Sequence, residues 1–270
     1  MRRIRARAHR RRSPPRHRLS PADVTFVVLT KDEESRIERC LRSLPDDAPR
    51  LVYDAESTDA TASIARALGA EVVSQPWSGF SKARTDAAAL VRTPWIFMLD
   101  ADERLTPELR AEIMALQPQA DINAYSVARM NFFCGRWIRG AGWWPDRLIR
   151  LFRKGSAVLD ARNQDSAQAL HETWRVSGAC VQLNAPLEHR SYDDVLTYRR
   201  KFARYTAIEA EGVRGKVGLW SLVSALAMVP VRALWLLIGR RGLLDGWRGA
   251  YVCAGSACYP AAVKWKARLG

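Results

Sequence analysis

The sequence has 270 residues, which suits one large domain or a domain with an appendage, and its hydrophobic content of 48% is ordinary for a globular protein. The net charge is +15, and nine arginines with no acidic residue lie among residues 1–18. The cysteines are scattered, odd in number and without metal-ligand spacing, which excludes a cysteine metal site and predicts reduced, mostly buried thiols in a cytosolic protein. They are Cys40, Cys134, Cys180, Cys253 and Cys258.

Residues 1–22 are predicted to form a basic, disordered tail, because a block of like charge is usually solvated. Such a tail could bind nucleic acid, or anionic lipid at ~1 kcal/mol per basic residue. It contains no apolar run, so it is not expected to be a secretory signal.

Apolar and β-branched runs predict strands at 24–29, 51–53, 71–73 and 95–99. Apolar residues on one face predict helices at 35–44 and from about 60 to 68, and an alanine-rich segment predicts one at 81–92. This alternation predicts an α/β fold with a parallel sheet and right-handed crossovers. No G-x-G-x-x-G follows the first strand, so a dinucleotide-binding enzyme is not expected.

Two carboxylates, Asp100 and Asp102, follow the fourth of these strands. They would point the same way if the extended geometry continued, at the sheet edge where ligands of open α/β sheets bind. Paired carboxylates there suit a divalent cation shared with substrate phosphates. The alternative is a solvated turn before a helix that is capped by Thr106 and begun by Pro107.

Polar residues at the other strand ends predict the rest of a nucleotide pocket. Asp54 could accept hydrogen bonds from a nucleobase or ribose, and Thr30 and Glu33 could complete its pocket. Lys82 and Arg84 could meet a diphosphate, or form a solvated helix face.

The order VVLTKDEE, YDAESTDAT, WSGF, FMLDADE resembles the family 2 inverting glycosyltransferases with the GT-A fold, over roughly residues 24–116. The resemblance implies a Rossmann-like, mostly parallel sheet flanked by helices. It also implies a nucleotide-sugar donor with Mg²⁺ or Mn²⁺ as cofactor. In this likeness Asp54 contacts the base, Asp100 the ribose or metal, and Asp102 the metal.

A strand is predicted at 123–130, followed by an aromatic, glycine-rich loop and a strand at 147–153. We assign Trp143, Trp144 and Asp146 of this loop to acceptor binding, because aromatic faces beside polar groups suit sugar rings. Tryptophans also serve in packing and at membrane interfaces, which is the alternative.

The stretches PDRLIRLFRK, LHE and LEHRSY resemble a narrower subgroup, the glycosyltransferases of lipopolysaccharide core biosynthesis. By that likeness Glu172 is the general base, and His171 is a metal or diphosphate neighbour. Asp146 and Asp165 are rivals for the base, since proton removal from a hydroxyl needs a positioned carboxylate or imidazole.

We predict a glycosyltransferase domain at 23–191 and a helical extension at 192–270, beginning with an amphipathic helix over 192–212. Residues 217–239 are apolar and would form a helix of about 35 Å, enough to cross ~30 Å of hydrocarbon. Arg232 within it would cost ~2.5–3.5 kcal/mol at the bilayer centre. We therefore expect helices lying in the interface at the cytoplasmic face of the inner membrane, with a spanning or re-entrant hairpin and a buried helical cap as alternatives.

The expected activity is inverting, metal-dependent sugar transfer to a hydroxyl of a membrane-associated glycolipid or polysaccharide, with no covalent enzyme intermediate. A polyprenyl-phosphate acceptor is the nearest alternative, and a non-catalytic scaffold that binds a sugar nucleotide is another. A nucleic-acid-binding protein is not expected, because acidic strand ends repel phosphate when no metal is bound.

Overall fold

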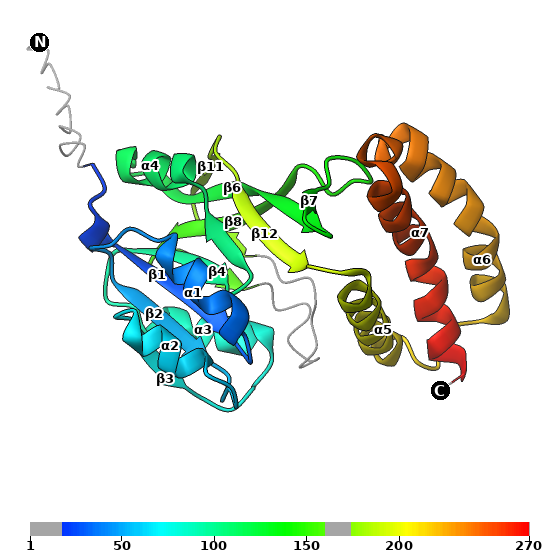
Figure 1. Cartoon of the computed structure of the whole chain (residues 1–270), viewed down its shortest axis with the longest axis horizontal. Coiled ribbons are helices and arrows are strands. Elements are labelled where there is room, and N and C mark those ends of the chain that lie inside the picture. Colours follow the sequence, from blue (N-terminus) through cyan, green and yellow to red (C-terminus); the bar gives the residue numbers. More distant parts are fainter. Residues whose placement is uncertain (1–17, 160–173, 270) are drawn as a thin grey trace, which may run out of the picture.

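The computed structural model describes residues 18–159 and 174–269, which form an α/β sheet domain followed by a bundle of long helices (Figure 1). The first half of the sheet domain comprises β1 (Val24–Thr30), α1 (Glu34–Arg42), β2 (Arg50–Asp54), α2 (Thr61–Ala67), β3 (Glu71–Ser74), α3 (Phe80–Leu90) and β4 (Trp95–Asp100). The four strands are parallel, in the order β3-β2-β1-β4, so the predicted alternation and parallel pairing are confirmed.

The second half of the sheet is mixed. It contains β5 (Glu103–Leu105), α4 (Pro107–Ala115), β6 (Ile122–Phe133), β7 (Arg136–Trp137), β8 (Asp146–Arg153), β11 (Ala179–Gln182) and β12 (Leu187–Tyr192). The sheet continues from β4 through β8, β6 and β12 to β5. Strand β8 is antiparallel to both neighbours, and β12 is parallel to β6 but antiparallel to β5. Two short strands, β9 (Ala157–Leu159) and β10 (Trp174–Val176), form a separate antiparallel pair.

Strands β1, β2 and β4 are buried on both faces, whereas the edge strand β3 is partly exposed. Side chains of a strand alternate between faces, so Phe26 of β1 enters one apolar cluster and Val27 enters another. Helix α1 contributes Ile37 to the first cluster and α3 contributes Ala83 to the second. Burial on both faces explains why these strands read as continuous apolar runs rather than as alternating patterns.

Strand register brings the polar strand ends together. Thr30 pairs with Asp54, and Asp100 pairs with the residue that precedes Thr30, so three predicted site residues lie at one edge of the sheet. Strand β12 lies beside β6, and this pairing places His189 opposite Asn131. Asn131 and His189, which are more than fifty positions apart in the sequence, are thereby held near the end of β4.

The helical extension consists of α5 (Val195–Gly212), α6 (Leu219–Leu234), η3 (Trp235–Gly239), η4 (Gly242–Asp245) and α7 (Gly246–Leu269). Helices α5 and α6 both pack against α7 (Figure 1). Phe133 at the end of β6 stacks on Tyr251 of α7, with ring centroids 5.6 Å apart. Asp245 is buried and accepts hydrogen bonds from the backbone N–H groups of Arg139 and Gly140, at 3.0 and 2.7 Å. The extension is therefore docked on the sheet domain by both apolar and polar contacts.

The outward face of α6 is apolar. Leu219–Gly239 is long and apolar enough to cross a membrane, and only 11% of its most apolar window is buried. This exposure does not fit the alternative of a buried helical cap. The membrane-surface and membrane-spanning alternatives remain predictions.

The predicted disordered tail is too long at its C-terminal end. The backbone N–H of Leu19 donates to the carbonyl of Leu116 at 2.9 Å, and the Leu19 side chain is buried in the core. A short helix, η1 (Pro21–Asp23), leads into β1. Residues 1–17 lie outside the described part of the chain.

The cysteines are free, but fewer are buried than predicted. Cys40 and Cys253 are buried, whereas Cys180 and Cys258 are exposed. Cys180 lies on β11, whose four residues are all exposed.

Candidate functional site

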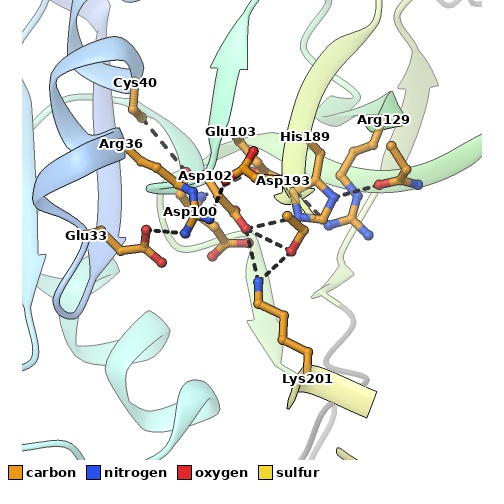
Figure 2. A network of polar contacts seen from close by, with 12 residues as sticks. Glu33, Arg36, Cys40, Asp100, Asp102, Glu103, Arg129, His189, Asp193 and Lys201 are labelled. Carbon is orange, nitrogen blue, oxygen red and sulfur yellow. Dashed lines mark hydrogen bonds and ion pairs between the residues drawn. The ribbon is translucent and has the colours of Figure 1, made fainter. Parts of the chain in front are cut away.

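The candidate site lies where β4 ends, beside side chains from β12 and α5 (Figure 2). Strand β4 stops at Asp100, residues 101 and 102 form a turn, and β5 begins at Glu103. The extended geometry therefore does not continue to Asp102, and the condition under which the two side chains would point the same way is not met. The turn gives each carboxylate its own set of partners.

Asp100 is held by two arginines. Arg84 of α3 donates to its Oδ1 at 2.7 Å, and Arg150 of β8 donates to its Oδ2 at 3.1 Å. Burial opposes ionisation, but the Arg84 and Arg150 guanidinium groups outweigh it and hold the pKa of Asp100 well below its usual range. The metal or ribose contact of Asp100 and the diphosphate contact of Arg84 stay predictions, since the structure pairs these two residues with each other.

Asp102 faces the other way, toward β12 and α5. Its Oδ2 accepts a hydrogen bond from Ser191 at 3.0 Å, and it lies 3.5 Å from His189 Nε2 and 3.7 Å from Lys201 Nζ. Burial opposes ionisation here too, but the neighbouring His189 and the Lys201 ammonium hold the pKa of Asp102 far below its usual range. An ionised carboxylate thus lies beside an imidazole nitrogen and a cationic side chain.

This pair of groups fits a divalent cation. The carboxylate of Asp102 and the imidazole of His189 offer oxygen and nitrogen donors of the kinds that Mn²⁺ accepts. Within residues 18–159 and 174–269 there is no group of three or more His, Cys, Asp or Glu that could hold a metal. Ions that act on nucleotides take their remaining ligands from water and substrate phosphates. The geometry therefore fits an open, substrate-shared ion and does not fit a closed structural metal site.

Glu103 supports the site through a buried ion pair with Arg150. Its side chain is fully buried, pairs closely with Arg150, and lies 3.4 Å from Arg129. It also accepts a hydrogen bond from the backbone N–H of Asp100 at 3.1 Å. Arg150 thus bridges Glu103 and Asp100, which fixes the end of β4 against β8.

Thr30 and Glu33 lie near this centre, and their part in a nucleotide pocket stays a prediction. The Thr30 hydroxyl oxygen is buried and has no hydrogen-bond partner among the described residues. Glu33 accepts from Arg36 at 2.8 Å, and Arg36 also pairs with Asp193 at 2.7 Å (Figure 2). Burial raises the pKa of Glu33, and the neighbouring Asp102 charge adds to this rise.

Asp54 and Lys82 have local partners. Asp54 is 1% exposed, accepts from the backbone N–H of Ser57 at 3.0 Å and from the Ser74 hydroxyl at 3.3 Å. It therefore organises the loop after β2, and its contact with a base stays a prediction. Lys82 is exposed on α3 and pairs with Asp86 at 2.7 Å, four residues along the same helix. This arrangement matches the solvated helix face that was the alternative for Lys82.

The residues predicted to bind the acceptor come from the loop between β7 and β8 and from the start of β8. Trp143 packs on an aromatic ring of β12 with centroids 5.6 Å apart, and Trp144 packs edge-on against one of β7 at 4.9 Å. Asp146 pairs with Arg129 at 2.6 Å. Burial opposes ionisation of Asp146, but Arg129 and further hydrogen bonds lower its pKa, which makes it a weak rival for the general base.

The other candidates for proton removal, Glu172 and Asp165, lie outside the described residues, as does His171. Their roles stay predictions.

The family model described as glycosyl transferase family 2 matches residues 25–170 of this chain. The chain belongs to glycosyl transferase family 2. This match confirms the family predicted from the strand-end motifs, and the site described above falls largely within the matched stretch.

Curated relatives share part of their length with this member of the family. An uncharacterized glycosyltransferase of Rickettsia bellii (strain RML369-C) is 40% identical over 108 residues, covering 38% of this chain and 37% of the relative. The lipopolysaccharide core biosynthesis glycosyltransferase LpsC of Rhizobium meliloti (strain 1021) is 28% identical over 155 residues, covering 55% of this chain and 56% of LpsC. The chain thus spans from about a third to a little over half of these relatives.

A solved structure extends the likeness to the fold of nearly the whole chain. The mannosyltransferase PcManGT of Pyrobaculum calidifontis, in complex with GDP-Man and Mn²⁺, superposes with a TM-score of 0.52. The alignment covers 94% of this chain and 88% of PcManGT at 14% identity. The predicted GT-A-type architecture is therefore confirmed.

Sequence reasoning missed several residues of the site. His189, Ser191 and Lys201 approach Asp102 from β12 and α5, and Glu103 and Arg150 brace Asp100. The one available signal was the polar run Glu188–Ser191 at the end of an otherwise strand-like segment. The sequence could not show that this strand lies beside β5.

Proposed function

We propose that this protein transfers a sugar from a nucleotide-sugar donor to an acceptor hydroxyl, with inversion at the anomeric carbon. The observation that carries the proposal is the pairing of Asp102 with His189 at the carboxyl edge of the sheet. Support comes from PcManGT, which shares the fold and is described in complex with GDP-Man and Mn²⁺. The partial likeness to LpsC supports an acceptor of the lipopolysaccharide-core type.

Asp102 and His189 are the residues that would hold Mg²⁺ or Mn²⁺, which when bound supplies positive charge to neutralise the departing diphosphate. Lys201 adds a cation on the same side, because its ammonium lies 3.7 Å from Asp102. Arg84 and Arg150 keep Asp100 ionised and in place. These preorganised charges need little rearrangement as negative charge grows on the leaving group.

In the proposed step, the acceptor oxygen forms a bond to the anomeric carbon while the bond from that carbon to the diphosphate oxygen breaks. The diphosphate leaves with the bonding electrons, and the acceptor proton passes to a carboxylate base. Glu172 is our proposed base, on the resemblance to the lipopolysaccharide-core subgroup. A single displacement of this kind forms no covalent enzyme intermediate.

A thermal-shift screen of nucleotide sugars, with and without Mn²⁺, tests donor binding. We expect stabilisation by one nucleotide family, larger with Mn²⁺, because a ligand that binds only the folded state raises the unfolding temperature. Release of nucleoside diphosphate is then measured for the donor that binds. Binding without slow release, or without transfer to a lipopolysaccharide-core acceptor, would favour a non-catalytic scaffold; transfer to polyprenyl phosphate would redirect the acceptor class.

We also propose that α6 lies flat on an anionic membrane surface. Its outward face carries large exposed apolar side chains, and the exposed stripe continues into η3, η4 and the start of α7. The stripe comprises Leu219, Trp220, Val223, Leu226, Met228, Val231, Leu234, Trp235, Ile238, Leu243, Leu244 and Trp247. Exposed arginines border it at the η3 end, where Arg240 lies 4.8 Å from the Trp235 ring. Apolar contact edged by basic residues is typical of interfacial helices.

A flat orientation is favoured because the inner face of α6 is already used. Leu222 of α6 and Leu236 of the adjoining η3 are buried, α6 packs on α7, and α7 packs on α5. Helix α5 in turn extends Lys201 to the site. Moving α6 alone across a bilayer would separate these contacts, whereas a flat helix keeps them.

Vesicle flotation tests this orientation. We expect binding to vesicles with phosphatidylglycerol, weaker binding to pure phosphatidylcholine, and release at alkaline pH, which frees surface-bound proteins. The variant Trp220→Ser with Val231→Ser should lose binding, and Thr85→Ser on exposed α3 is the control. Retention at alkaline pH would show a spanning helix, and equal binding to both lipids would refute the charge contribution.

A further inference from the structure

Asn131 lies behind the imidazole of His189, on the side away from Asp102. It is a buried residue of β6, and the β6–β12 register sets it directly opposite His189. Its Oδ1 lies 2.6 Å from His189 Nδ1. The other ring nitrogen, Nε2, lies 3.5 Å from Asp102 Oδ2. Asn131 therefore contacts the ring nitrogen that the proposed metal site does not use.

The orientation of the Asn131 amide is determined by two acceptors. Its Nδ2 donates to the backbone carbonyl of Trp143 at 3.2 Å and to the carboxylate of Asp146 at 3.1 Å. A carbonyl and an ionised carboxylate can only accept hydrogen bonds, so the amide nitrogen must face them. The amide oxygen is thereby directed at His189, and an amide oxygen can only accept.

A neutral imidazole carries one N–H, on either Nδ1 or Nε2. Placing the hydrogen on Nε2 would set the bare Nδ1 of His189 against the Asn131 oxygen, two acceptors 2.6 Å apart. Placing it on Nδ1 makes a short hydrogen bond to Asn131 and leaves the Nε2 lone pair directed toward the Asp102 carboxylate, but these two acceptors are 3.5 Å apart rather than 2.6 Å. Because the contact of His189 with Asn131 is closer than that with Asp102, it favours the Nδ1–H tautomer.

We propose that Asn131 is a positioning residue that holds His189 in the Nδ1–H tautomer, so that Nε2 presents its lone pair beside Asp102 to a divalent cation. Partners of this kind orient a metal-binding histidine and raise its basicity, and their loss typically costs 10–100-fold in metal affinity. Asp146 belongs to the same chain of contacts, because it orients the amide. This assigns to Asp146 a supporting role distinct from the acceptor contact predicted from the sequence.

The proposal depends on the proposed metal site only for the function of the Nδ1–H tautomer, which is to offer Nε2 to the cation. The tautomer itself can be measured on the metal-free full chain, by long-range ¹H–¹⁵N NMR at ~pH 8.5, about two units above the ordinary pKa of imidazole. The chain has four histidines, and the His189→Gln variant identifies the signal. We expect a protonated Nδ1 and an unprotonated Nε2. A protonated Nε2 would overturn the proposal without any variant of Asn131.

Mn²⁺ affinity, measured by electron paramagnetic resonance with Mn²⁺ alone, tests the consequence. Asn131→Ala should mix the two tautomers and weaken Mn²⁺ binding about 10–100-fold. Asn131→Asp retains an acceptor oxygen and should retain the Nδ1–H tautomer. The control is Asn123→Ala on the same strand, because Asn123 donates to Ser177 and has no contact with His189.

The two proposals fail in different ways. A wild-type chain with the Nδ1–H tautomer that does not bind Mn²⁺ would refute the metal contact and support the role of Asn131 in the tautomer. Unchanged tautomer and unchanged Mn²⁺ affinity in a folded Asn131→Ala chain would refute the role of Asn131.

Discussion

The buried carboxylate of Glu103 should contribute far more to the free energy of unfolding than an exposed glutamate carboxylate does. We consider Glu103→Gln, which keeps the size of the side chain and removes its charge. Glu103 is fully buried, and its partner Arg150 is 4% exposed. Breaking a buried ion pair by neutralising one partner typically costs ~3–5 kcal/mol, because the other charge stays buried. Arg150 keeps Asp100 at 3.1 Å, so we expect the lower end, ~3 kcal/mol.

The matched control is Glu38→Gln on α1. Glu38 pairs with Arg42 at 2.8 Å, but both side chains are more than half exposed. Exposed pairs of this spacing contribute about 0.3–0.5 kcal/mol.

The assay is urea unfolding followed by circular dichroism, with a thermal scan alongside. Glu103→Gln should lower the unfolding temperature by ~6–12 °C at a typical 2–4 °C per kcal/mol. The Glu38 control should change little. A difference of less than about 1 kcal/mol between the two variants would refute the view that Glu103 braces the site through a desolvated pair.

Three further predictions concern the site itself. Asp102→Asn should lose Mn²⁺-dependent transfer by about two orders of magnitude, and full activity of that variant in chelator-treated buffer would contradict the metal contact. Lys201→Ala should weaken nucleoside diphosphate binding by ~10-fold in calorimetry, and Lys201→Arg should weaken it less, because arginine keeps the positive charge. An equal loss of binding for the unphosphorylated nucleoside would show that the effect of Lys201→Ala is purely structural. Asp146→Asn should destabilise the chain at neutral pH. The folded-state pKa of Asp146 is lowered, so its ionised form stabilises the fold above the unfolded-state pKa, and that contribution is lost as pH falls through the folded-state pKa. The destabilisation measured by urea unfolding should therefore shrink toward ~pH 3, and a constant difference across that range would count against the Arg129 pair.

The amino-acid pattern predicted the first half of the sheet well because that half is built from local signals. Strand 24–30 and its neighbours are apolar on both faces, and helices alternate with the four parallel strands, so period and length identify them. The cap at Thr106 was equally local: its side chain accepts from the backbone N–H of Leu109, as predicted for a helix begun by Pro107.

The second half of the sheet could not be predicted in the same way. Strand β5 is three residues long and follows a two-residue turn, so it has no period to detect. Its pairing with β12 joins Glu103 to His189 across more than eighty residues of sequence. Nothing in the local composition of either segment specifies that partner.

The sequence by itself determined the family, the parallel strands and the placement of Asp54, Asp100 and Asp102 near strand ends, because burial and turn chemistry act on neighbouring residues. Only the tertiary structure decided which groups surround each carboxylate. It set Arg84 and Arg150 on Asp100, and His189 with Lys201 beside Asp102. The physical reason is that strand register and helix packing are set by the whole core, and a site made of charges depends on a few ångströms of that arrangement.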